Sequence, residues 1–94
     1  MGLFGFGKKK EKTLEELAGE FGITLVNDSL DGVYEKILVK GADESEEIAK
    51  IRLLRNCREK GARLLSSRLL YSRHESFGKN LYVVASVAYL LKAS

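Results

Sequence analysis

The stretch LYVVASVAYLLK, residues 81–92, decides the fold of this 94-residue chain. Its valines and tyrosines favour a β-strand. Successive side chains of a strand point to opposite faces of a sheet, so the odd-numbered and even-numbered residues form two rows. Both rows are largely apolar here, whereas a sheet with one face in water alternates apolar and polar residues. The sequence therefore predicts that both faces of this strand are covered.

Two kinds of cover are available for the second face of this strand. The chain has only two helices to place, so the cover is the first helix, another subunit, or both. We expect homo-oligomerisation, and the alternative is a monomer with one helix packed on each face. The row chosen as the candidate oligomer interface consists of Tyr82, Val84, Ala88 and Leu90.

The segment that precedes this strand is RLLSSRLLYSRH, residues 63–74. Together the two segments indicate a long antiparallel hairpin around Gly78. The leucine pairs at 64–65 and 69–70 also fit a helix, so strand and helix both stay open for residues 63–74.

The N-terminal half contains a helix and two strands. Thr13 and Glu16 form a capping box, an apolar stripe follows at helical spacing, and Gly22 ends the helix. Short β-branched runs predict strands over residues 23–26 and 33–40. We expect a break over residues 41–45.

A second helix is predicted from a cap at Asp43 or Ser45 to about Lys60, with Gly61 as its end. Acidic residues in its first turn and basic residues in its later turns both suit the helix dipole. The side predicted to be buried carries Ile51, Leu54 and Cys57, with Ile48 and Leu53 beside them.

The fold class that follows is α+β, with element order αββαββ, an antiparallel sheet, a C-terminal β-hairpin and two helices. At 45% hydrophobic and 31% charged residues, the chain suits one globular domain over residues 13–94. No apolar run reaches the roughly 20 residues of a membrane span, and we expect a cytoplasmic protein.

Residues 1–12, MGLFGFGKKKEK, are expected to be a flexible basic tail. Its aromatic residues and lysines fit a weak anchor at an anionic membrane surface. The alternative is a frayed terminus whose lysines only aid solubility.

The net charge of +3 sums three unlike blocks: +3 over residues 1–12, −8 over 13–47 and +8 over 48–94. The basic blocks make contact with nucleic acid or membrane phosphates the alternative function. The opposite charges also favour self-association of the chain. The candidate residues for an anionic surface are Lys8, Lys9, Lys10, Lys12, Arg52, Arg55 and Arg58.

Catalytic and metal chemistry have little to work with. One Cys and one His cannot form a disulfide framework or a zinc site of several Cys and His ligands in a single chain. Cys57 is expected to be a small buried thiol, although its basic neighbours suit a reactive one if it is exposed. His74 is expected to be solvated. We therefore expect no enzyme, no metal and no cofactor.

The segments GVYEK at 32–36 and KGA at 60–62, with the closing apolar hairpin, resemble the YbjQ-like family of small βαββ proteins. That family is described as heavy-metal-binding and is similar to ring-forming oligomers. The resemblance implies an oligomer and carries over no site residue, because no ligand cluster is present. Dodecin-like flavin-binding proteins share the topology, but this chain has no Trp to stack on a flavin.

The function expected from the sequence is a small non-enzymatic binding or assembly module that works as a homo-oligomer. The main alternative is a peripheral binder of anionic surfaces, through the tail and the second helix. A third class is a carrier that holds a small ligand at a subunit interface.

Overall fold

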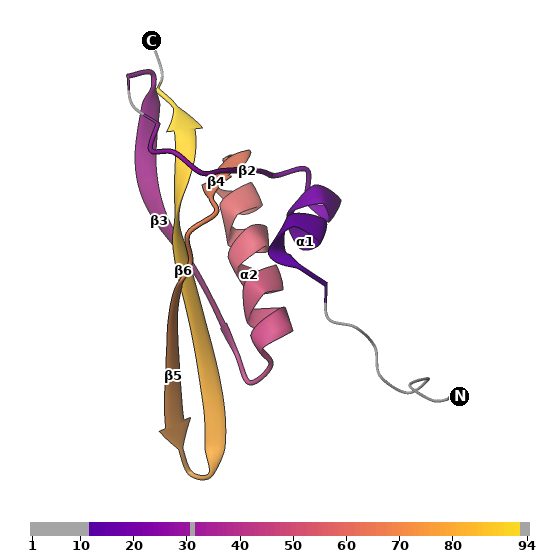
Figure 1. Ribbon diagram of the computed structural model, residues 1–94. Helices are drawn as coiled ribbons and strands as arrows, with labels where there is room; N and C mark the ends of the chain where they lie inside the picture. The colour runs from indigo at the N-terminus through magenta and orange to yellow at the C-terminus, as the bar shows by residue number, and fades with distance from the viewer. Residues whose placement is uncertain (1–11, 31, 93–94) are drawn as a thin grey trace, which may run out of the picture.

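The computed structural model describes residues 12–30 and 32–92, which form two helices and a five-stranded sheet (Figure 1). The predicted α+β class is confirmed, and so is the C-terminal hairpin. The flexible tail predicted for residues 1–12 lies outside the described residues except for Lys12. In chain order the elements are α1 (Leu14–Glu20), β2 (Thr24–Val26), β3 (Tyr34–Asp43), α2 (Glu46–Glu59), β4 (Leu64–Ser66), β5 (Leu70–Ser76) and β6 (Lys79–Leu91).

Strand β6 is the centre of the sheet. Its first edge pairs antiparallel with β3 over ten residues, from Tyr34 opposite Leu91 to Asp43 opposite Tyr82. Its second edge pairs antiparallel with β4 and then with β5. Strand β2 pairs with β4 in the parallel direction. The sheet is therefore mixed, whereas the sequence predicted an antiparallel one.

The segment 63–74 forms two strands, and residues 67–69 between them leave the ladder. The hydroxyl of Ser86, which is buried on β6, lies 2.9 Å from the carbonyl oxygens of both Ser66 and Arg68. On the other side of the break, the backbone N–H of Ser67 donates to the carbonyl of Val26 at 2.8 Å. The backbone groups at the interruption thus have hydrogen-bond partners of their own. Strand and helix were both open for residues 63–74, and the structure shows strands.

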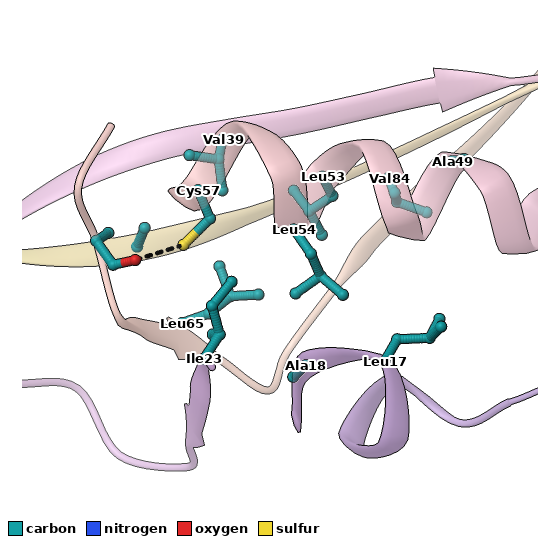
Figure 2. Close-up of a cluster of buried hydrophobic side chains, with 12 residues drawn as sticks. Leu17, Ala18, Ile23, Val39, Ala49, Leu53, Leu54, Cys57, Leu65 and Val84 are labelled. Carbon is teal, nitrogen blue, oxygen red and sulfur yellow. Dashed lines mark hydrogen bonds between the residues drawn. The ribbon is translucent and has the colours of Figure 1, made fainter. Parts of the chain in front are cut away.

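Helix α2 packs on one face of the sheet, and α1 packs beside it (Figures 1 and 2). A Cβ atom on Gly41 would lie 2.1 Å from the carbonyl oxygen of Ala49, so a side chain at position 41 would collide with α2. The break expected over residues 41–45 is wrong for 41–43, because β3 continues through Gly41 to Asp43, and only residues 44–45 lie between β3 and α2. The largest fully buried side chains between helix and sheet are Leu53, Leu54, Leu65, Val39, Val84 and Cys57.

The helix ends largely follow the sequence predictions. Thr13 and Glu16 form the predicted capping box. Ser45 caps α2 with its hydroxyl, while the carboxylate of Asp43 accepts from the backbone N–H of Ser45 at 2.9 Å. Ile48, expected beside the buried side of α2, is 42% exposed.

Candidate functional site

The two faces of the sheet differ in what covers them. On β3, Ile37, Val39 and Gly41 lie on the face that packs against α2. The alternate residues of each strand point to the opposite face, which neither α1 nor α2 covers (Figure 1). We call this surface the open face. Its apolar residues are Leu38 on β3, Leu70 on β5, and Leu81, Val83, Ala85 and Val87 on β6.

The open face exposes large apolar side chains to water. Leu38 is 55% exposed, Leu70 is 71% exposed and Leu81 is 41% exposed. The register explains why they form one surface: Leu38 lies opposite Val87, and Leu70 lies opposite Ala85. Contiguous apolar patches of this kind are uncommon on monomeric proteins and mark interaction sites.

The four residues predicted as an oligomer interface lie on the other face. Val84 and Ala88 are 0% exposed in the core, and Tyr82 and Leu90 pack against that core. The face predicted to meet a second subunit is therefore the one that α2 of the same chain covers. The row that remains open carries the odd-numbered residues of β6.

Close to the start of β3, the same side of the sheet is covered by the chain itself. Tyr89 is only 5% exposed. Its ring meets the ring of Tyr34 edge-on at 6.3 Å between centroids, and residues 27–29 lie beside it. The exposed apolar surface is thus limited to the part of the sheet nearer the β5–β6 hairpin.

A basic groove of about 500 Å³ lies between α2 and the outer edge of β3. Lys40 and Ala42 line one wall, and Arg52 and Arg55 line the other. The side-chain amide of Asn56 donates to the carbonyl oxygen of Lys40 at 2.5 Å and so ties the helix to the strand edge.

The structure brings together only part of the predicted anionic-surface set. Arg52 and Arg55 share the groove with Lys40, which the sequence did not single out, and Arg52 is paired with Asp43 at 3.3 Å. Arg58 instead points toward the end of α1, where its guanidinium lies near Gly22.

The predicted tail residues are placed only in part. The ammonium of Lys12 pairs with Glu20 of α1, and this carboxylate raises the pKa of Lys12. The predictions for Lys8, Lys9 and Lys10 lie outside the described residues.

The single Cys and the single His occupy different environments. Cys57 is buried, as predicted, and its thiol lies 3.7 Å from the carbonyl oxygen of Ala62 (Figure 2). Burial raises the pKa of this thiol, and the positive charge of Arg58 opposes the rise. His74 is exposed on β5, with its Nε2 atom 2.7 Å from the hydroxyl of Ser72. Within residues 12–30 and 32–92, no three His, Cys, Asp or Glu side chains gather as a metal site would require.

Fold and surfaces together define a small α+β protein with an open apolar sheet face and a basic groove. No protein family, no curated protein and no solved structure matches this chain. The YbjQ-like resemblance therefore stays a prediction. Neither helix in the described part of the chain has the length and apolar character that a membrane crossing requires.

Proposed function

We propose that this protein is a non-enzymatic assembly module whose copies pack together through the open face. The observation that carries the proposal is the exposure of Leu38, Leu70 and Leu81 on one sheet surface that no helix covers. Burial of apolar surface is the main driving force of protein association, at about 25 cal/mol per Å².

A second copy is the occupant that best fits this surface. Two sheets pack well face to face when their twists match, about 10 Å apart, and identical sheets have identical twists. Strand β6 with its neighbours β3 and β5 has thirteen, ten and seven residues, which give at most about 480 Å² of flat sheet before side-chain relief is added. This area is of the order that a standard interface removes from each partner, about 800 Å².

The charges on this side of the sheet also suit such an interface. Lys36 and Lys40 are on β3, the outermost strand of the open face, so they lie at the rim. Charged residues at a rim stay in contact with water while the apolar centre is buried. Assembly through the open face would leave both helices of each copy on the outside.

Native mass spectrometry and light scattering of the purified chain at about 50 µM test the proposal. We expect an even multiple of the chain mass. Leu38→Glu replaces an exposed apolar side chain of the open face with a charge and is expected to lower that multiple. Val33→Glu is the matched control: Val33 is 61% exposed, precedes β3, and is not part of the open face as defined.

A monomer at this concentration would overturn the proposal. Equal effects of Leu38→Glu and Val33→Glu would also overturn it, because the open face would then have no special role. Circular dichroism of both variants confirms that the fold is retained in each case.

The basic groove favours a second candidate function, the binding of nucleic-acid phosphates. Lys40, Arg52 and Arg55 converge on one concave surface. A groove of this shape suits a narrow phosphate chain better than a flat bilayer. The binding would be electrostatic and would weaken as salt rises.

Fluorescence anisotropy with a labelled single-stranded oligodeoxynucleotide tests this candidate. The double variant Lys40→Ala/Arg55→Ala is expected to lose affinity by about tenfold more than Arg63→Ala/Lys92→Ala. The control pair removes the same charge outside the groove. Equal losses would rule out a groove site, and binding to phosphatidylserine vesicles alone would assign the charge to a membrane surface.

A further inference from the structure

Strand β5 offers a second surface to a partner, its outer edge. All seven residues of β5 are exposed, and its tip with β6 extends beyond α2 and β3 (Figure 1). Within the described residues β5 pairs only with β6, so no strand satisfies its other edge. An unpaired edge of this length is a template for another strand.

The turn of the hairpin determines which backbone groups point outward. Ser76 lies opposite Lys79 and closes a two-residue turn formed by Phe77 and Gly78, both at positive φ (52° and 75°). In such a hairpin the closing residues form a hydrogen-bonded pair. By alternation along β5, the N–H and C=O groups of Tyr71, Arg73 and Glu75 point away from β6, toward the free edge.

The side chains on this edge are self-complementary in one antiparallel register. When His74 lies opposite His74 of a second copy, Arg73 lies opposite Glu75 of that copy, and Glu75 lies opposite its Arg73. A shift by one residue in each copy places either Arg73 opposite Arg73 or Glu75 opposite Glu75, which is unfavourable. Within the described part of the chain, Arg73 and Glu75 have no ion-pair partner of their own.

The same register brings an exposed aromatic side chain to an aromatic cleft. Phe77 at the tip is fully exposed, and its positive φ is unusual for a bulky residue. Six residues away, about 20 Å along the strand, Tyr71 and Tyr82 line a cleft of about 340 Å³. Opposite strands in this register place Phe77 of each copy beside Tyr71 of the other.

We propose that β5 pairs antiparallel with β5 of a second copy, about a two-fold axis at His74, so that the two sheets become one. This proposal rests on the proposed self-assembly and adds a second interface to it. Backbone hydrogen bonds, two reciprocal Arg73–Glu75 pairs and two Phe77–Tyr71 contacts would hold the pair. The arrangement is closed, because each copy gives and receives the same contacts.

Disulfide trapping tests the register directly. Residue 74 would form a non-hydrogen-bonded pair, with Cα atoms about 4.5 Å apart, which a disulfide can span. We expect His74→Cys to yield a covalent dimer on mild oxidation. Ser76→Cys is the matched control, since the two residues at position 76 would be about 13 Å apart and would not cross-link. The buried Cys57 leaves little background.

Charge reversal tests the ion pairs. Arg73→Glu alone would place Glu opposite Glu and is expected to weaken association by at least tenfold, whereas Arg73→Glu/Glu75→Arg restores complementary pairs and is expected to recover it. Native mass spectrometry of the Leu38→Glu variant separates the two interfaces, because an edge-paired dimer should survive that change.

The outcomes distinguish failure of the edge pairing from failure of self-assembly as a whole. An oligomer that cross-links through neither residue, or through 76 as readily as 74, overturns the edge pairing and leaves the open-face assembly standing. A chain that is monomeric under all conditions overturns both.

Discussion

The two faces of β6 are nearly alike in sequence, but their environments differ, most of all near the β5–β6 hairpin. On one face Val84 is fully buried under α2, while on the other Leu81 is 41% exposed. The neighbouring strand makes the difference. Strand β3 presents Ile37, Val39 and Gly41 to the helix, and it carries its lysines on the open face. In this sheet, α2 covers the face on which β3 carries apolar residues and a glycine, and the lysines of β3 lie on the other face.

The largest effect is expected when the same charge is placed on each face of β6 in turn. Val84→Asp would bury an unpaired carboxylate in the core and is expected to destabilise the fold by about 4 kcal/mol or more. Leu81→Asp on the open face, where the side chain is 41% exposed, is expected to change the free energy of unfolding by less than about 1 kcal/mol within a chain. Urea denaturation with circular dichroism measures both.

Measuring the oligomeric state of the two variants should show the opposite order of effects. Leu81→Asp should reduce self-association while the chain stays folded. If both substitutions destabilised the fold equally, the two faces would not differ as described.

The next effect concerns the glycine that lets α2 approach the sheet. Gly41→Ala would bring a methyl group within 2.1 Å of the Ala49 carbonyl oxygen, so α2 must shift. We expect a loss of about 3 kcal/mol in the free energy of unfolding. Gly19→Ala is the control: its Cβ meets nothing within 4 Å, and the change should stabilise α1 by about 0.5 to 1 kcal/mol. A neutral Gly41→Ala would contradict the close packing of helix on strand.

A smaller effect is expected at the interruption between β4 and β5. Ser86→Ala removes the hydroxyl that the carbonyl oxygens of Ser66 and Arg68 share. We expect a loss of about 1 to 2 kcal/mol, because buried acceptors lose their donor. Ser76→Ala, at the exposed end of β5, should change stability by less than about 0.5 kcal/mol. Equal effects would mean that the interruption does not depend on Ser86.

The smallest expected effect is a pH dependence of stability caused by Cys57, which is buried between α2 and the sheet. Burial raises the pKa of the Cys57 thiol above its ordinary value of 9.0. Above that pH the unfolded chain loses the thiol proton first, so stability falls until the pH passes the folded pKa, and below 9.0 the contribution is complete. Urea midpoints at about pH 8 and about pH 10 should therefore fall less for Cys57→Ala than for the parent chain. An identical fall in both chains would exclude the thiol as the cause.

Local signals predicted the elements well. Thr13 with Glu16 specified the start of α1, Gly61 specified the end of α2, and Gly78 located the final hairpin. These features act over a few residues, so the sequence contains all the information they need.

The features that the sequence did not reveal depend on distant partners. Gly41 resembles a break unless one knows that α2 lies above it. The interruption at residues 67–69 has its hydrogen-bond partners at Ser86 and Val26, both far along the chain. The choice of face on β6 failed for the same reason. The contrast on β3 between Ile37 with Val39 and Lys36 with Lys40 was a usable signal, but it needed the β3–β6 register.

The candidate sites show the same division. The sequence showed that both rows of β6 are apolar, but it placed the candidate interface on the even-numbered row, which packs in the core under α2. Arg52 and Arg55 were predicted together, but the contribution of Lys40 to the groove needed the tertiary fold.

The central place of β6 determines when the sheet can form during synthesis on the ribosome. It is the last element of the described chain, yet β3, β4 and β5 all pair with it, and only β2 and β4 pair without it. During synthesis the earlier strands therefore wait without their partner until residues 79–91 have left the ribosome. We therefore expect folding to be late and cooperative, and we expect nascent chains that stop short of β6 to expose unpaired strands to chaperones and proteases.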